Sequence, residues 1–290
     1  MEKIDVELNL FFIIYYIMKN GVAFGIGIVS GVALVLVVDK ITDKNDNKNM
    51  NSGYKNLQGE DFPGPNELPD TLCKGNPTDY TIPAGVTSID LGAISRCGSL
   101  TTITVDKNNN VYSSIDGVLF NKNQTELIIY PSAKIGESYE IPDSVTSIVS
   151  NAFGNCKSLT TITIPASVTS IGDYAFFDCE SLTSINIPSS VTSIGSAAFY
   201  NCKSLTTITI PANSQLTSIG DSAFSQCSSL TTVNTIPVGL KSIGSDAFSG
   251  CSSLVPFDIS NVEYVGDNVF KGCKSPSKGG KGGKGGKNRC

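Results

Sequence analysis

The sequence predicts a β-rich solenoid, a right-handed superhelix of short parallel strands joined by 3-10 or helical turns, together with one N-terminal transmembrane helix. Closely similar units follow one another from Ile141 to Phe270, and their cysteines recur at positions 156, 179, 202, 227, 251 and 273. A period of roughly 20 to 29 residues with Leu and Ile at fixed offsets is typical of such solenoids. A unit of this size cannot bury its own apolar side, so neighbouring units must stack.

Each unit begins with a short strand whose side chains alternate. In one such unit, Ile162 and Ile164 point to the same side because residues two apart share a face of a strand. Thr161 and Thr163 then face outward, and β-branched residues suit a pleated surface. Pro165 ends the strand because proline has no N–H for the ladder.

The second half of the unit leads the chain into the next coil. Residues 168–171 predict a second short strand, and Gly172 is expected to turn the chain because glycine tolerates turn conformations. Residues 173–179 are expected to form a helical or 3-10 turn that places Phe176 and Cys179 inside. Equivalent residues of successive coils then lie about 4.8 Å apart, as in parallel sheets, and form continuous columns.

The unit I-P-x-S-V-T-S-I-G-x-x-A-F-x-x-C-x-S-L-T-T-I-T resembles the BspA-type leucine-rich repeat of bacterial and protist surface proteins. The resemblance extends from Ile82 to Cys273. It implies a leucine-rich repeat fold and, by analogy only, attachment to host or matrix proteins. The repeat domain is predicted to span residues 68–273, with the degenerate segment 68–81 as a cap; a ligand-binding loop is the alternative for this segment.

The spacing of the repeats is interrupted once. The interval from Cys97 to Cys156 is longer than the interval from Cys156 to Cys202, which contains two complete units. The extra length predicts a hairpin insertion at about residues 111–131, in which 118–120 pairs with 127–130 across a polar turn.

Residues 21–38 carry no charge and are numerous enough for a membrane span. We interpret them as a retained anchor, because no A-x-A-like cleavage site follows; a cleaved signal and a soluble N-terminus are the alternatives. Gly27 and Gly31 have the G-x-x-x-G spacing that favours a helix–helix dimer in lipid.

Residues 1–20 form a flank, and a translation start at Met18 would make the residues before it an extension of the gene model.

Two segments are predicted to lack a core. Residues 39–67 are rich in Asp, Lys, Asn and Gly, and are expected to form a flexible polar linker. Residues 274–290 carry six positive charges in a Gly/Lys tract. We expect this tail to be disordered and to act as a solubilising tail, with contact to acidic polymers or lipid headgroups as the alternative.

The orientation of the chain in the membrane is open from the sequence. More lysines follow the span than precede it, which favours cytoplasmic repeats by the positive-inside rule. The family resemblance favours an extracellular or lumenal repeat domain, and we expect this orientation.

Composition excludes several classes of function. The net charge is -5 and only 16% of the residues are charged, which argues against nucleic acid as a partner because phosphate binding needs a dense basic field. The chain has no histidine, so Ser-His-Asp and Cys-His mechanisms are absent. Acidic residues occur singly and no phosphate-binding loop is present. We therefore expect no enzyme, no cofactor and no metal site.

Nine cysteines are present, and seven of them recur at one repeat position. We expect those at 97, 156, 179, 202, 227, 251 and 273 to be buried thiols that pack as small hydrophobes. Stacked neighbours have parallel side chains, which strains the torsion of a disulfide; disulfides and metal or redox roles are the alternatives. Cys290, in the tail, is the thiol expected to be reactive.

The outward strand positions are the predicted ligand-binding residues, with surface filling by β-formers as the alternative. They are Thr161, Thr163, Ser184, Asn186, Thr207, Thr209, Thr232 and Asn234. A hydroxyl surface needs an aromatic or Arg anchor for affinity, and Tyr174, Phe177 and Tyr200 are the candidates. Asn123, in an N-x-T sequence on the hairpin turn, is a glycosylation candidate.

These features predict a membrane-anchored recognition or adhesion module with a protein or glycan ligand. A cytoplasmic scaffold using the same surface is the alternative. An ice-binding threonine ladder is a third hypothesis, but Ser184, Asn186 and Asn234 break the ladder, and leucine-rich sheets are curved.

Overall fold

Two compact units make up the chain, residues 1–65 and residues 66–290. The computed structural model describes residues 54–55, 61–62, 77–91, 94 and 97–275. In the first unit, β1 (Tyr54–Lys55) and β2 (Asp61–Phe62) form an antiparallel pair. This pair falls within the predicted linker 39–67.

Several predicted segments lie outside the described residues: the flank 1–20, the span 21–38 and most of the tail 274–290. Among the described residues, only Leu91 and Ile94 are helical. None of the helices searched there has the length and apolar character needed to cross a membrane. The anchor therefore stays a prediction.

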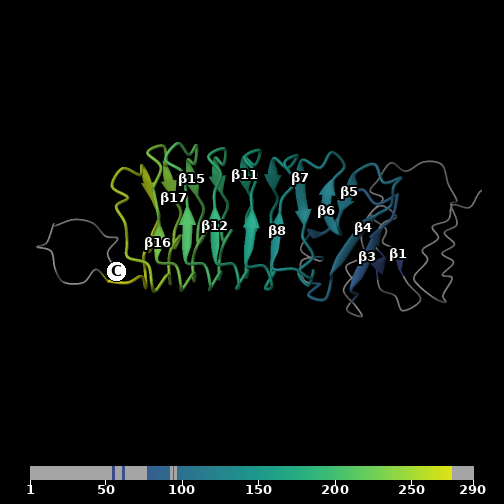
Figure 1. The fold of residues 1–290 in the computed structure, drawn as a ribbon, viewed down its shortest axis with the longest axis horizontal. Helices are drawn as coiled ribbons and strands as arrows, with labels where there is room; N and C mark the ends of the chain where they lie inside the picture. The colour runs from purple at the N-terminus through teal and green to yellow at the C-terminus, as the bar shows by residue number, and fades with distance from the viewer. Residues whose placement is uncertain (1–53, 56–60, 63–76, 92–93, 95–96, 276–290) are drawn as a thin grey trace, which may run out of the picture. The chain divides into compact units, whose positions relative to one another are not determined.

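In the second unit, the coils carry two rows of short strands (Figure 1). The first row has three groups of parallel strands: β3 (Asp79–Ile82) with β4 (Thr102–Val105), β8 (Ser138–Glu140) with β10 (Thr161–Thr163), and β12 (Ser184–Asn186) with β14 (Thr207–Thr209) and β16 (Thr232–Val233). The second row is one sheet that contains β5 (Tyr112–Ile115), β6 (Val118–Asn121), β7 (Glu126–Ile129), β9 (Ser147–Ile148), β11 (Ser170–Ile171), β13 (Ser193–Ile194), β15 (Ser218–Ile219), β17 (Ser242–Ile243) and β18 (Tyr264–Val265).

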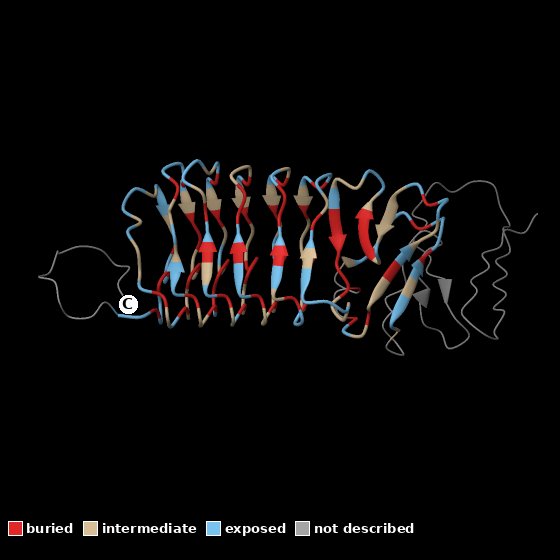
Figure 2. Ribbon diagram, viewed as in Figure 1, coloured by how far each residue is buried: buried red, intermediate tan, exposed pale blue. Residues whose placement is uncertain are grey.

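The register of the strands places like residues opposite one another. Ile185 pairs with Ile208 in the first row, and Ile171 pairs with Ile194 in the second. This confirms the predicted solenoid of stacked parallel strands. Figure 2 shows that buried residues recur from coil to coil, in the strands of both rows and in the turns that join them.

A column of phenylalanine rings runs through the core. Phe153, Phe176, Phe199, Phe224 and Phe248 are each at most 1% exposed. Centroids of successive rings are 4.8 to 5.2 Å apart, and their planes lie within 12° of each other. This is close to the spacing of parallel strands, because each coil places its ring on the ring of the coil before it.

The segment after the second strand forms successive turns, so the predicted helical or 3-10 turn over residues 173–179 is wrong. Tyr174 and Asp178 each have a φ of 56°, whereas helices require negative φ. The N–H of Tyr174 donates to Ser196 O of the next coil at 2.9 Å. Turn hydrogen bonds within the segment, such as the one from the N–H of Phe177 to Tyr174 O at 3.0 Å, alternate with these bonds between coils.

A glycine follows the second strand in each coil from β11 onward, for a reason other than the predicted one. The members are Gly172, Gly195, Gly220, Gly244 and Gly266. None of them has a positive φ, so the turn conformation expected of Gly172 is not what requires glycine. A Cβ atom at Gly195 would lie 2.5 Å from the backbone nitrogen of Asp173 in the preceding coil. The close approach of neighbouring coils requires it.

The predicted hairpin pairing of 118–120 with 127–130 is confirmed by the antiparallel strands β6 and β7. A third strand, β5, pairs with β6, and β7 pairs in parallel with β9. The insertion therefore extends the second row. Val118 and Phe120 belong to the larger core, whereas Leu119 belongs to a smaller N-terminal core. β6 is thus buried on both faces, which explains its run of three buried residues.

The cysteine prediction needs one correction. Cys97 is disulfide-bonded, and it lies in the smaller core, apart from the column that begins at Cys156. The prediction of a free buried thiol is therefore wrong for Cys97. The six others that the structure describes, Cys156 to Cys273, are buried and carry no disulfide.

Candidate ligand-binding surface

The predicted hydroxyl and amide residues form the outer surface of the first strand row, which we call the strand face. In β10, Thr161 and Thr163 are exposed on either side of the buried Ile162. Ser184 and Asn186 are exposed in β12 in the same way. In the remaining coils, Thr209, Thr232 and Asn234 are exposed and Thr207 is half-buried.

A second column of threonines, one residue earlier in each coil, has a structural role. The hydroxyls of Thr160, Thr183, Thr206 and Thr231 each donate to a main-chain carbonyl of the preceding coil at 2.9 to 3.1 Å. In contrast, Thr161, Thr163 and Thr209 form no side-chain hydrogen bond with any other described residue. The two columns therefore separate hydroxyls that hold the coils together from hydroxyls available to a ligand.

Asn234 differs from the other members of the strand face. Its Oδ1 accepts a hydrogen bond from the backbone N–H of Ile210 at 2.7 Å. This contact continues the hydrogen bonding beyond the end of β16. Asn234 therefore supports the edge of the strand face with one acceptor position of its amide oxygen.

The predicted aromatic anchors contact one another and form what we call the aromatic cluster. The rings of Phe177 and Tyr200 are stacked, with centroids 5.5 Å apart and planes 10° apart. Tyr174 meets Phe177 edge-on at 6.0 Å and 65°. No hydrogen bond, ion pair or ring contact among the described residues joins this cluster to the strand face. The predicted site residues thus form two separate groups, on different segments of the coil.

Polar side chains follow the aromatic cluster along the turn. The Nδ2 group of Asn201 donates to Oδ1 of Asp178 at 2.6 Å. Gln226, at the equivalent position of the next coil, is exposed. In the coil after that, Gly250 occupies the equivalent position and lies next to the Gln226 amide. Amide and carboxylate groups therefore stand side by side in three successive coils.

Three charged side chains on the outside of three successive coils form ion pairs that were not predicted from the sequence. Glu180 lies between Lys157, at 3.2 Å, and Lys203, at 3.3 Å. Hydrogen bonds from Lys157 and Lys203 lower the pKa of the Glu180 carboxyl. These residues are separated by one repeat unit each, and this spacing could have indicated that they lie side by side. Exposed ion pairs of this kind contribute little to stability.

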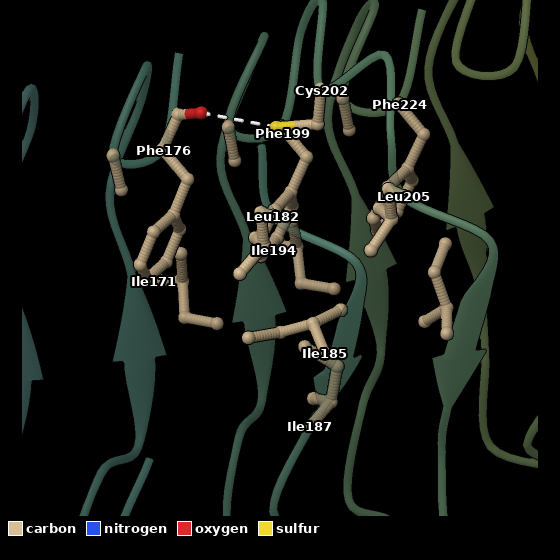
Figure 3. Close-up of a cluster of buried hydrophobic side chains, with 14 of the residues drawn as sticks. Ile171, Phe176, Leu182, Ile185, Ile187, Ile194, Phe199, Cys202, Leu205 and Phe224 are labelled. Carbon is tan, nitrogen blue, oxygen red and sulfur yellow. Dashed lines mark hydrogen bonds between the residues drawn. The ribbon is translucent and has the colours of Figure 1, made fainter. Parts of the chain in front are cut away.

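The repeat cysteines are poor nucleophiles. Burial raises the pKa of the Cys156 and Cys227 thiols well above its ordinary value, and the thiolate is the reactive form. Each thiol instead donates to a carbonyl of the preceding coil, as Cys202 Sγ does to Phe176 O at 3.2 Å (Figure 3). Among the described residues, no group of three potential ligands is placed to hold a metal ion.

Asn123, the glycosylation candidate, is exposed on the turn between β6 and β7. The Thr125 hydroxyl of its N-x-T sequence accepts a hydrogen bond from Asn121 Nδ2 at 2.9 Å. The acceptor amide of Asn123 is therefore open to solvent, while the threonine is held by the turn.

Stacked coils, two strand rows and a surface without catalytic groups among the described residues define the class of this molecule: it is a leucine-rich repeat solenoid. Residues 71–138 and 136–254 match the BspA type leucine-rich repeat region, in 6 copies. The chain belongs to the BspA-type leucine-rich repeat family. Among curated proteins, no match to the chain was found.

Two solved structures are similar to this chain. A leucine-rich repeat protein from Eubacterium ventriosum is 34% identical, with a TM-score of 0.55, over 71% of this chain and 62% of that protein. A leucine-rich cell surface protein from Faecalibacterium prausnitzii is 36% identical, with a TM-score of 0.57, over 63% of this chain and 49% of that protein. The match therefore spans less than two thirds of the length of either structure.

Proposed function

We propose that this protein is a membrane-anchored recognition module, which binds a protein or glycan ligand at a cell surface through its strand face. In this proposal residues 21–38 form the anchor, and Gly27 and Gly31 pair the helices of two copies in lipid. The chain performs no catalysis and binds no nucleic acid.

One observation carries the proposal. Hydroxyls of the strand face are repeated along four coils and make almost no hydrogen bonds with the residues that the structure describes, whereas the hydroxyls of the threonines beside them all donate to backbone carbonyls. A rigid array of unused donors and acceptors suits binding, because little side-chain entropy is lost when a ligand pairs with it. Extended surfaces of solenoids commonly serve as binding surfaces.

Two further observations support a position outside the cytoplasm. Cys97 is disulfide-bonded, and disulfides persist mainly in oxidising compartments. One of the similar structures is a cell surface protein. The remaining thiols are compatible with such a compartment because they are buried in the core.

The binding test compares two charge variants of the unit 66–290. In the first variant, Thr161, Ser184 and Thr209 are replaced by Lys, which places charged side chains on the strand face. In the control variant, the exposed Ala166 and Ala212, on the turns between the two rows, are replaced by Lys. Each protein is coupled to beads and used to capture surface-biotinylated material from intact cells.

The proposal expects the control variant to capture as much biotinylated material as the wild type, and the strand-face variant to capture little. Circular dichroism of both variants checks that the coils are intact. Equal capture by the strand-face variant and the wild type would show that the strand face is not the binding surface.

A cytoplasmic scaffold remains the second candidate, and the lysines that follow residues 21–38 favour it. Protease treatment of intact cells that express the full chain distinguishes the two. Digestion of the repeats places them outside, and protection places them in the cytoplasm. No observation favours the ice-binding hypothesis, since Ser184 and Asn186 interrupt the threonine ladder; purified protein is expected to show no thermal hysteresis.

A further inference from the structure

The aromatic cluster occupies a position that small or polar residues fill in other coils. The position of Phe177 and Tyr200 is held by Gly154 in the coil before them and by Ser225 and Ser249 in the coils after them. The coil after Tyr200 therefore has a serine, Ser225, at the position where a ring would continue the stack. Both ends of this two-ring stack adjoin small side chains.

These two rings are not needed by the core. The core is filled by Phe176 and Phe199, which are fully buried, and neither Phe177 nor Tyr200 belongs to the hydrophobic cluster or packs against it. Tyr174, the third ring of the cluster, is 45% exposed. Aromatic rings that the fold does not use, gathered at one place on the surface, are typical of binding sites.

The polar groups beside the rings suit hydroxyls. After their mutual hydrogen bond of 2.6 Å, Asp178 and Asn201 retain unused acceptor and donor positions, and the Gln226 amide adds one of each. Successive coils place these groups about 4.8 Å apart. A sugar hydroxyl both donates and accepts, and a sugar ring has apolar C–H faces that pack on aromatic rings.

The charged residues near the aromatic cluster favour a neutral glycan over an anionic one. The aromatic cluster has a carboxylate, Asp178, immediately beside it, and the nearby Lys203 is paired with Glu180. Lys157 and Lys203 share the single carboxylate of Glu180, so these three residues and Asp178 together carry no net charge, and an anionic sugar gains no net attraction there. An uncharged chain does not depend on such attraction.

We propose that the aromatic cluster, with Asp178, Asn201 and Gln226, is a subsite for a neutral, unbranched glycan chain. The chain runs along the solenoid axis, with one sugar ring packed on Tyr200 and its hydroxyls bonded to the amide and carboxylate groups. This inference rests on the proposed recognition function and assigns the ligand class at a surface separate from the strand face.

The test uses the full-length protein in a zwitterionic detergent, so that no sugar head group competes. Cellohexaose, xylohexaose, mannohexaose and laminarihexaose are titrated by calorimetry. At least one hexaose is expected to bind, and Tyr200→Ala or Phe177→Ala to weaken it roughly tenfold or more. Tyr200→Phe keeps the ring and should retain binding. Tyr264→Ala is the matched control, because Tyr264 is 60% exposed on β18, away from the cluster.

Three results would overturn the inference: no binding of any hexaose, unchanged affinity after Tyr200→Ala, or preference for a sulfated hexasaccharide over the neutral ones. Failure here is distinguishable from failure of the recognition function. If Tyr200→Ala has no effect and the strand-face lysines still abolish capture of cell-surface material, only the glycan subsite is wrong. If both surfaces are without effect, the recognition function itself is wrong.

Discussion

Asn109 shows how much a single side chain can contribute where the repeats are irregular. It is fully buried and uses every hydrogen-bonding position of its amide. Its Nδ2 donates to Pro83 O and Val86 O at 2.8 and 2.9 Å, and its Oδ1 accepts from the N–H groups of Val111 and Tyr112 at 2.9 and 2.8 Å. Asn109 thereby joins the N-terminal coil to the start of the insertion.

Replacing Asn109 by Ala is expected to destabilise the N-terminal coils by about 3 kcal/mol, because two buried carbonyls and two N–H groups lose their partner. Hydrogen exchange followed by mass spectrometry measures this as faster exchange in β3, β4 and β5. The coils beyond Cys156 should exchange as in the wild type, since they belong to the other core. Uniform acceleration along the chain would contradict this local role.

The glycine column gives a second prediction at single residues. Gly195→Ala places a Cβ atom 2.5 Å from Asp173 N, so the coils must separate, and we expect a loss of about 1–3 kcal/mol in the free energy of unfolding. Gly239→Ala is the control, because nothing lies within 4 Å of its Cβ position. Urea denaturation measures both. Equal midpoints for the two variants would show that close approach does not require glycine.

The coil is the element that repeats, and its register predicts how the chain tolerates deletion. Removing residues 180–202 deletes one complete repeat unit and joins Cys179 to Lys203. Ile171 would then pair with Ile219, as each now pairs with Ile194. We expect a folded, somewhat less stable solenoid, because only one interface between neighbours is lost.

A deletion out of register is the control for this prediction. Removing residues 180–198 deletes less than one repeat unit and brings unlike side chains together between the coil that contains the junction and its neighbour. This variant should show a weaker β-sheet signal in circular dichroism than the wild type, while the deletion of a complete unit keeps that signal. A native signal from both variants would contradict a fold held by matched columns.

The regular coils could be predicted from the sequence because each position repeats several times. The alternation around Ile162 defined the inner and outer sides of the first strand, and 168–171 predicted the second. The turn over 173–179 could not be predicted, since the left-handed conformations of Tyr174 and Asp178 depend on hydrogen bonds to the next coil. Residues with no counterpart in other coils, such as Asn109, leave no periodic signal at all.

Prediction of the candidate site was partial for a similar reason. The outward side chains follow from strand alternation, as for Thr161 and Thr163. The Thr160 hydroxyl donates to a backbone carbonyl of the preceding coil, whereas the Thr161 hydroxyl does not. This difference depends on the distance between coils, and the sequence of one repeat unit does not contain that distance. The separation of Tyr200 from the strand face likewise depends on the three-dimensional path of the coil, which the sequence pattern does not give.

The whole molecule is expected to lose stability in alkaline solution. Burial raises the pKa of the Cys156, Cys202 and Cys227 thiols above the ordinary 9.0, and it raises the pKa of Tyr130 from 10.0 to about 12. The unfolded chain ionises first. Stability is therefore complete below pH 9 and falls as the pH rises above it, with Tyr130 adding to the loss between pH 10 and about pH 12.

Urea midpoints measured from about pH 7 to about pH 11 check this dependence. Replacing Cys227 by Ala removes one titrating group, so the midpoint of this variant should start lower but fall less steeply with pH. A wild-type midpoint that stays constant up to about pH 10 would contradict the contribution of the buried thiols.

Because each coil touches only its neighbours, the solenoid has a defined response to mechanical load. Tension between its ends detaches the outermost coil first, and one repeat unit pulled straight releases on the order of 70 Å of chain. The coils still stacked keep their paired strands and their surface. A protein built in this way lengthens step by step under load, and each step limits the force on the coils that remain stacked.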